Sequence, residues 1–311
     1  MEAYEKGSYL YHEGRRAEAI VFFNKAISSN PNNAQAYFYK ARALNRIGKK
    51  EKAIFCYERS IILKPDFKRA YYNKGHVLKE MRKREEAIAC YDKVLGLDPS
   101  STRAFYAKGN CLSEMGKKEE AIDCYDRAIS LDPNDAWTFT DKGRALAKMG
   151  RYEEAIDCHN KAISLNPNFM NVYDNKGRAL VAMGRNEEAV GCFDLAIGIA
   201  PNDAELYNNK GFTFNKMKKS QEAIDCCNKA LSLDPNHSKA YFNKGNALKE
   251  MKKYKEAVES YDKSLCLDPY YADTYFEKGN VLKSMGKETE ALSCYETARN
   301  LNPNLKDVIS G

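Results

Sequence analysis

The sequence predicts an all-α protein built as a solenoid of tandem antiparallel helix pairs. Its nine prolines are evenly spaced, each 34 positions after the one before. They are Pro31, Pro65, Pro99, Pro133, Pro167, Pro201, Pro235, Pro269 and Pro303. A proline ends a helix because it lacks an amide hydrogen and clashes with the preceding turn. The fixed spacing therefore marks nine copies of one helical unit, and a period of this length is typical of a repeat array.

The prolines also set the boundaries of the repeats, when each is numbered so that proline takes position 32. The repeats are residues 1–33 (which lack the first position), 34–67, 68–101, 102–135, 136–169, 170–203, 204–237, 238–271 and 272–305. Residues 306–311 remain as a tail that could be the start of a truncated capping helix. A globular chain of this length would be expected to form about two domains, but the repeat predicts a single solenoid over residues 1–305.

The first half of each repeat has the pattern of a helix with one packed face. Position 8 is glycine in eight repeats, with Ala41 as the exception, and position 4 is aromatic in eight. Position 11 is leucine except at Phe214. These positions share one helical face. Glycine inside a helix costs about 1 kcal/mol relative to alanine, so we expect a second helix to pack closely against position 8.

The second half of each repeat begins with turn signals and continues as another helix. Glycine fills position 15 in six repeats, where a helix end commonly needs a left-handed residue. Arg82, Lys218 and Lys252 take its place in the others. Position 19 is glutamate in eight repeats, a charge that suits a helix N-terminus. Position 20 is always alanine, and position 24 is usually aromatic. Such short helices are marginal alone, so stacking of the repeats must stabilise them.

This combination closely resembles the tetratricopeptide repeat, and the resemblance covers essentially the whole chain. It implies a right-handed superhelix whose first helices line a concave groove, with positions 2, 5, 6, 9, 12 and 13 facing the groove. It also implies a protein-binding scaffold. One departure is systematic, because position 7, usually apolar in the family, is lysine in all nine repeats. We interpret these lysines as structural, with a packed stem and a charged end in water.

Composition points to a non-catalytic intracellular protein. The sequence has no run long enough to span a membrane, no signal-peptide core, and no phosphate loop, nucleophile elbow or zinc motif. Seven of the ten cysteines recur at position 23, too far apart for disulfides and without metal-ligand spacing. We therefore expect reduced thiols, a cytoplasmic location, and neither cofactor nor metal. The net charge of +7 is modest and does not imply a nucleic-acid surface.

Variation at the groove positions suggests what the groove binds. Arginine and lysine recur at these positions in repeats 2 to 6, and asparagine recurs at positions 6 and 9. Arginine suits carboxylates, and an amide can bond to a peptide backbone. The candidate groove residues are Arg42, Arg46, Arg69, Asn73, His76, Arg103, Asn110, Arg144, Lys148, Asn175, Arg178, Asn209, Asn243 and Asn246. The hypothesis is that the groove binds an extended, acidic peptide segment. Aromatic residues at position 5, together with Trp137 and Phe212, are further candidate contacts wherever they are not packed against a neighbouring repeat.

Several alternatives stay open. The chain could be the targeting or regulatory arm of a larger enzyme, an RNA-binding groove, or a purely architectural element. The lysine and arginine pattern of the family's carboxylate clamp is absent, which argues against a chaperone-tail adaptor. The last repeat lacks a capping helix, so we expect either that the chain is a fragment of a longer protein or that this end pairs with another molecule, such as a second copy.

Overall fold

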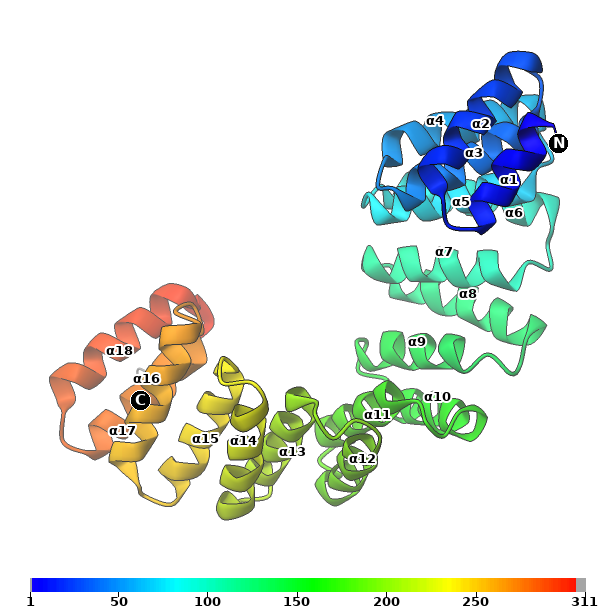
Figure 1. Cartoon of the computed structure of the whole chain (residues 1–311). Coiled ribbons are helices and arrows are strands. Elements are labelled where there is room, and N and C mark those ends of the chain that lie inside the picture. Colours follow the sequence, from blue (N-terminus) through cyan, green and yellow to red (C-terminus); the bar gives the residue numbers. More distant parts are fainter. Residues whose placement is uncertain (1, 306–311) are drawn as a thin grey trace. The chain divides into compact units, whose positions relative to one another are not determined.

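The computed structural model describes residues 2–305, and within them the chain forms eighteen α-helices and one short 3₁₀ helix, Pro303–Leu305 (Figure 1). Contacts divide the chain into two compact units, Met1–Arg151 (unit 1) and Tyr152–Gly311 (unit 2). The boundary lies in the fifth predicted repeat, at the turn between its two helices. The residues proposed as a truncated capping helix, 306–311, lie outside the described part of the chain.

Unit 1 contains the first nine helices. The first helices of its repeats are α1 (Ala3–His12), α3 (Ala34–Arg46), α5 (Lys68–Glu80), α7 (Thr102–Glu114) and α9 (Ala136–Ala147). The second helices are α2 (Arg16–Ser29), α4 (Lys50–Leu63), α6 (Arg84–Leu97) and α8 (Lys118–Leu131). Each of these second helices packs against the first helix of its own repeat and of the next repeat.

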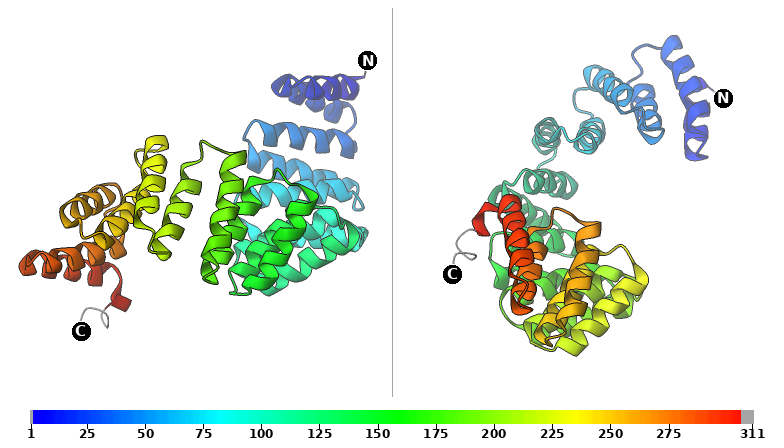
Figure 2. Two further views of the ribbon diagram at one scale, coloured as in Figure 1. Left: turned by 90° about the horizontal axis from the view of Figure 1, so that it is seen from below. Right: turned by 90° about the vertical axis from the view of Figure 1, so that its left-hand side faces the viewer.

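Unit 2 repeats this arrangement. It begins with α10 (Tyr152–Leu165), the second helix of the fifth repeat. Four hairpins follow: α11 (Met170–Ala182) with α12 (Asn186–Ile199), α13 (Ala204–Lys216) with α14 (Ser220–Leu233), α15 (Ser238–Glu250) with α16 (Tyr254–Leu267), and α17 (Ala272–Ser284) with α18 (Glu288–Leu301). Figure 2 shows the paired helices from two further directions. The predicted all-α repeat solenoid is confirmed.

The turn and packing signals act as the sequence predicts. All six glycines at position 15 have positive φ, between 75° and 82°, and Arg82, Lys218 and Lys252 adopt the same region at 59° to 63°. At position 8, the missing side chain makes room for the ring at position 24 of the second helix. A β-carbon on Gly109, for example, would lie 2.7 Å from Cε1 of Tyr125. The expected close approach of the two helices is therefore confirmed.

The lysines at position 7 form ion pairs between repeats. Five of them pair with the carboxylate at position 25 of the preceding repeat, at 2.5 to 2.8 Å. The pairs are Lys74–Glu58, Lys108–Asp92, Lys142–Asp126, Lys210–Asp194 and Lys278–Asp262. These lysine side chains are 20% to 26% exposed, so their stems pack while the ammonium groups reach the acids at the surface. This arrangement supports the structural interpretation of the lysines.

Candidate functional site

The first helices lie on the inner side of each unit. In unit 1, α1, α3, α5, α7 and α9 each contact the next first helix along the row. In unit 2, α11, α13, α15 and α17 do the same. No comparable contact joins successive second helices between residues 2 and 305. Because the rows of first helices approach more closely than the rows of second helices, each unit curves with its first helices on the concave side.

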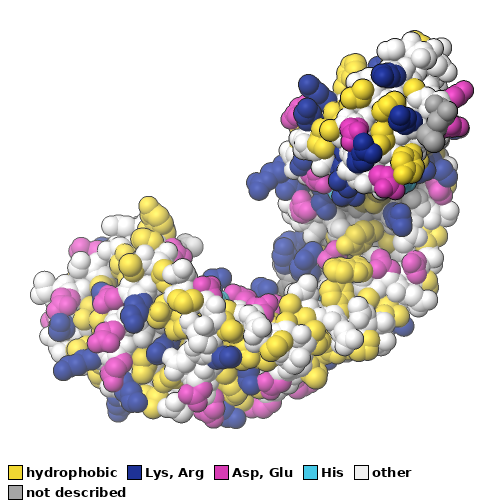
Figure 3. Space-filling model, viewed as in Figure 1, with side chains coloured by type: hydrophobic (Ala, Val, Ile, Leu, Met, Phe, Trp, Pro, Cys, Tyr) yellow, Lys and Arg dark blue, Asp and Glu magenta, His cyan; other side chains and the backbone are white. Residues whose placement is uncertain are grey.

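In unit 1 the concave side has a cavity of about 200 Å³ between α1, α3 and α5. It is lined by Tyr11, Arg42, Asn45, Arg46, Tyr57, Tyr72, Asn73, His76 and Glu80. Four of the predicted groove residues therefore share one cavity: Arg42, Arg46, Asn73 and His76. Tyr57, from α4, was not among the predicted site residues because its position in the repeat belongs to the core. Lys and Arg side chains recur down the left-hand edge of unit 1 in Figure 3.

Aromatic rings hold two of the arginines in place. The guanidinium of Arg42 lies 5.0 Å from the ring centroid of Tyr11 and 5.8 Å from that of Phe38. The guanidinium of Arg69 lies 5.2 Å from the same Phe38 ring. A guanidinium over an aromatic face is attracted by the ring quadrupole and keeps its hydrogen-bond donors for other partners. The two arginines are thus ordered without using a carboxylate.

The acidic residues near this cavity already have cationic partners. Glu80 forms an ion pair with Lys50 at 3.0 Å and lies 3.3 Å from Nδ1 of His76. Across residues 2–305, by contrast, no carboxylate lies within 4.0 Å of the guanidinium groups of Arg42, Arg46, Arg69 or Arg103. Burial raises the pKa of the Tyr57 hydroxyl, and the positive charges of Arg42 and Arg46 act in the opposite direction. The concave face of repeats 2 to 4 therefore carries uncompensated positive charge.

The basic residues of the fifth repeat are different. Arg144 pairs with Asp141 at 2.8 Å, and the Tyr106 hydroxyl donates to the same carboxylate at 2.8 Å. Lys148 is exposed, and its backbone carbonyl accepts from Lys118. Asn110, in the fourth repeat, accepts from the Tyr125 hydroxyl at 2.7 Å. Of these predicted groove residues, Arg144 and Asn110 already use polar groups within the chain.

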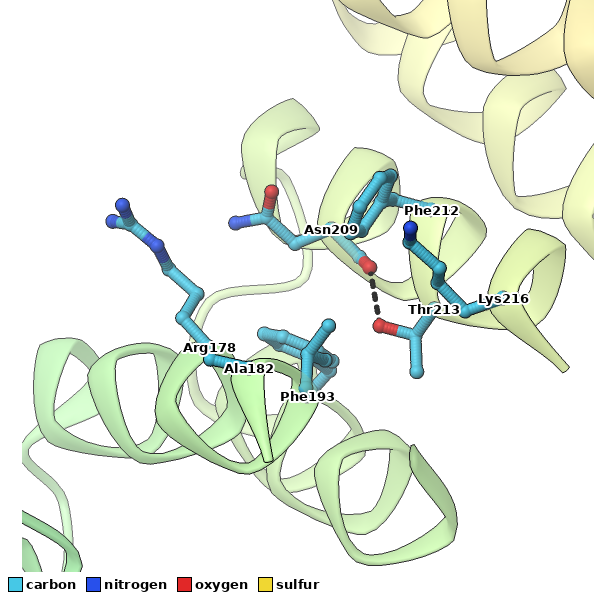
Figure 4. A pocket seen from close by; sticks show the side chains of 8 residues that line it. Arg178, Ala182, Phe193, Asn209, Phe212, Thr213 and Lys216 are labelled. Carbon is cyan, nitrogen blue, oxygen red and sulfur yellow. Dashed lines mark hydrogen bonds between the residues drawn. The ribbon is translucent and has the colours of Figure 1, made fainter. Parts of the chain in front are cut away.

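Unit 2 has a larger cavity, about 470 Å³, between α11 and α13 (Figure 4). Its lining residues are Arg178, Val181, Ala182, Phe193, Asn209, Phe212, Thr213 and Lys216. Lys216 lies 5.3 Å from the ring centroid of Phe212. Lys216 was missed in the sequence, although it occupies position 13, the same repeat position as Arg46 and Lys148. The cavity combines an apolar floor with two cations.

The cavity in unit 2 coincides with a change at position 5. In the other repeats with an aromatic residue at this position, its ring packs against the position-24 ring of the same repeat, as Tyr72 does against Tyr91 at 5.7 Å. Most of these rings therefore pack inside their own repeat. The expected packing against a neighbouring repeat is seen for Tyr4, whose ring centroid lies 6.1 Å from that of Tyr39. In repeat 6 position 5 is Asp174, so no such ring covers Phe193.

The asparagines at position 6 are partly used inside the chain. Asn73 donates to the carbonyl of Arg69 at 2.7 Å, and Asn209 donates to Asp174 at 2.9 Å. Asn243 is only 4% exposed and donates to Asn208 at 2.8 Å. At position 9, Asn246 accepts from Tyr261 at 2.8 Å. Asn175 is half-buried. The amides therefore support the inner wall as much as they line it.

Asp174 is an unusual acid in this wall. Burial raises the pKa of its carboxyl above the ordinary value, while the hydrogen bond from Asn209 and the nearby charge of Arg178 lower it. The guanidinium of Arg178 lies 3.9 Å from this carboxylate and is largely exposed. Arg178 is therefore only loosely engaged by Asp174.

The described residues show no chemistry of a metal or membrane site. Between residues 2 and 305, no cluster of three His, Cys, Asp or Glu side chains could hold a metal ion. None of the helices in that range combines the length and the apolar character that crossing a membrane requires. The ten cysteines are free thiols. Burial raises the pKa of several of them, including Cys56 and Cys90, and raises the pKa of Cys227 to about 12.

Comparison with solved structures finds the same architecture. YrrB, described as a tetratricopeptide repeat protein with an unusual peptide-binding site, is 26% identical with a TM-score of 0.51, and the match covers 59% of this chain and 95% of that one. A tetratricopeptide repeat protein from Parabacteroides merdae ATCC 43184 is 15% identical with a TM-score of 0.64, and the match covers 80% of this chain and 98% of that one. A chain of the APC/C hetero-tetramer Cut9–Hcn1 is 18% identical with a TM-score of 0.60, and the match covers 89% of this chain and 55% of that one.

Comparison with sequence families identifies the repeat. A search of curated proteins found no match. The family model described as the C-terminal domain of cilia and flagella-associated protein 70 matches residues 67–274. Two models of the tetratricopeptide repeat match residues 22–55 and residues 3–33 and 272–305. With more than half of the sequence matched and the solenoid of helix pairs in place, the chain belongs to the tetratricopeptide repeat family.

Proposed function

We propose that the protein is a non-catalytic interaction scaffold whose unit 1 binds an extended, acidic segment of a partner protein on its concave side. The observation that carries this proposal is the set of four arginines, Arg42, Arg46, Arg69 and Arg103, which have no carboxylate partner among the described residues. A guanidinium binds a carboxylate through two parallel hydrogen bonds, so an unpartnered arginine is well suited to an acidic side chain.

The aromatic residues around these arginines support the proposal. Because Arg42 and Arg69 are already ordered against the Phe38 ring, a ligand would meet side chains that have lost part of their freedom. Tyr11 and Tyr72 line the same cavity and offer rigid contact area for a peptide. YrrB, which shares the repeat and 26% of its aligned residues, is itself described as having a peptide-binding site.

The cavity of unit 2 offers a second subsite for the same class of ligand. Arg178 and Lys216 provide the positive charge, and Phe193 and Phe212 provide an apolar surface for one side chain of the bound segment. An acidic segment with an apolar residue between its carboxylates fits this combination. Each unit can be tested separately, since the two cavities share no residue.

The proposal is tested by fluorescence anisotropy with two labelled ten-residue peptides, one alternating Glu and Leu and the other alternating Lys and Leu. The Glu peptide should bind the full chain, and the double variant Arg42→Glu/Arg46→Glu should keep its helicity but lose the part of that binding that unit 1 provides. The matched control is Arg127→Glu/Lys161→Glu, which makes the same change in net charge on the exposed surface of second helices. Equal affinity of both double variants for the Glu peptide would show that the proposed site is wrong.

A further inference from the structure

The outer side of unit 1 carries an apolar ridge on α4 that the other repeats lack. Phe55 is 61% exposed and Ile62 is 63% exposed, and their spacing of seven residues places them on the same side of the helix. They occupy repeat positions 22 and 29. Repeat 1 has an exposed apolar residue at position 22 only, Val21, and Ser28 at position 29. In repeats 3 to 9, position 22 is Ala, Asp, Gly, Glu or Ser, and position 29 is Gly, Ser, Cys or Asn. Two large apolar side chains at these positions are therefore a feature of repeat 2.

Phe55 borders a cavity of about 480 Å³ that lies between α2 and α4 and is also lined by α3. Its apolar lining consists of Ile20, Leu44, Phe55 and Cys56, and its polar lining consists of Asn24, Lys40, Lys49, Glu51 and Lys52. Three of the charged residues are therefore lysines and one is a glutamate. None of its lining residues belongs to the concave cavity described above.

Among the described residues, Lys40 in this cavity lacks the carboxylate partner that five equivalent lysines have, and so do Lys176 and Lys244, which also follow an asparagine at position 25. Lys40 occupies position 7, where five lysines pair with an acid at position 25 of the preceding repeat, but that position is Asn24 in repeat 1. Throughout residues 2–305, no carboxylate lies within 4.0 Å of the Lys40 ammonium. The next cavity, between α4 and α6, shows the contrast, because there Lys74 pairs with Glu58 at 2.8 Å.

We propose that the cavity between α2 and α4 is a second interaction site, distinct from the concave face, that binds an acidic and apolar segment of a partner protein. An apolar side chain of the partner packs beside Phe55, and a carboxylate of the partner reaches Lys40, where it replaces the acid missing at Asn24. An ammonium group without a carboxylate partner gains a charge-assisted hydrogen bond in this way. An exposed aromatic side chain beside a cavity is a typical anchor of protein interfaces.

The other repeats supply the substitutions that test this site. Asn24→Asp provides the missing acid within the chain, as Asp92 does at the same position two repeats later. The new carboxylate should form an ion pair with Lys40 and so compete with a carboxylate of the partner. Phe55→Asp introduces the residue that Asp123 places at position 22. Since the fold already tolerates both residues at these positions, we expect both variants to fold, and circular dichroism melting checks this. Lys40→Gln serves as the second variant if either fails to fold.

The probe is a phage-displayed library of random twelve-residue peptides selected on the full wild-type chain. We expect a class of selected peptides that carry acidic and apolar residues and lose at least about fivefold in affinity on Asn24→Asp and on Phe55→Asp, the loss that corresponds to about 1 kcal/mol. The same peptides should retain their affinity for Arg42→Glu/Arg46→Glu and for the control Asn160→Asp, which adds the same acid at position 25 in unit 2.

The result that overturns the proposal is equally defined. If no selected peptide depends on Asn24 and Phe55, or if the dependent peptides are basic, the cavity is not a site for acidic segments. Peptides whose affinity falls only for Arg42→Glu/Arg46→Glu bind the concave face. If all selected peptides behave in this way, there is no second site. The two proposals therefore fail or succeed independently.

Discussion

The ring of Tyr261 fills the space that a side chain on Gly245 would need. A β-carbon on Gly245 would lie 2.5 Å from Cε1 of Tyr261, well inside ordinary contact distance. The ring is fully buried against the facing helix, so it cannot move aside without disturbing the core. The glycine at position 8 is thus a packing requirement between the two helices of a hairpin.

Gly245→Ala should therefore destabilise the protein, although alanine is the better helix former. Overpacking of a core typically costs about 1–3 kcal/mol, which exceeds the gain of up to about 1 kcal/mol in helix propensity. The matched control is Gly191→Ala in α12, where an added β-carbon meets nothing within 4 Å, so propensity alone should raise stability. Thermal melting followed by circular dichroism should give a lower midpoint for the first variant and a higher one for the second. Midpoints that move in the same direction would contradict this account of the glycine.

The fold was predictable because its signals are local. Proline at position 32 ends a helix, and glycine at position 15 permits a positive φ, whatever the rest of the chain does. Even the exceptions, such as Arg82 with φ of 63°, followed from the repeat, because the turn needs that conformation at this position. Nine repetitions of the same local pattern left few alternatives to a solenoid of hairpins.

The candidate site was less predictable because it depends on contacts between residues far apart in the sequence. Position 6 places Asn243 on the first helix, but its burial depends on Asn208, which is 35 residues earlier. Likewise, the sequence places Arg42 and Arg69 on the inner side, but not that both guanidinium groups share the ring of Phe38. The arginines could be found from repeat positions alone, whereas their partners required the structure.

The ion pairs between repeats should contribute little individually. Asp194→Asn removes the carboxylate that pairs with Lys210 and leaves asparagine, the residue found at the same position in repeats 1, 5 and 7. Asp194 is 54% exposed, so solvent screens the pair, and we expect a loss of about 0.2–1 kcal/mol that shrinks in high salt. Thermal melting at low and high salt measures this. A salt-independent loss of several kcal/mol would mean that the lysine is held mainly by its carboxylate and not by its packed stem.

Asp174 should make stability depend on pH in the acid range. Because burial raises the pKa of this carboxyl in the folded chain, the folded state binds the proton more tightly than the unfolded state does. Stability from this group is therefore present at low pH and is lost as pH rises through the raised pKa. Asp174→Asn keeps an oxygen that can accept from Asn209 and removes the charge, so it should raise the melting midpoint.

The increase for Asp174→Asn should be larger at about pH 7 than at about pH 4, because a larger fraction of the wild-type carboxyl is charged at the higher pH. Asp157→Asn, an exposed position on α10 in the same unit, is the control for a change in net charge. An increase of the same size at both pH values, or an equal increase in the control, would mean that the burial of Asp174 does not decide the effect.

Asp141 should limit binding of acidic peptides in unit 1. Its carboxylate engages Arg144 at 2.8 Å. Among the five predicted groove arginines of repeats 2 to 5, only Arg144 has a carboxylate partner within the described part of the chain. Asp141→Asn removes the negative charge but keeps an oxygen that can accept from the Tyr106 hydroxyl, which now donates to Asp141 at 2.8 Å. We expect the affinity for the alternating Glu and Leu peptide to rise by up to about fivefold, the equivalent of about 1 kcal/mol.

The control for Asp141→Asn is Asp123→Asn, which makes the same change in net charge on the exposed surface of α8. If the peptide binds along the concave side as far as α9, the affinity should rise for Asp141→Asn alone. Equal increases in both variants would indicate a long-range effect of net charge, which added salt should abolish. No increase in either would confine the bound segment to the region of Arg42, Arg46 and Arg69, where the guanidinium groups of Arg42 and Arg69 lie against the ring of Phe38 and have no carboxylate partner among the described residues.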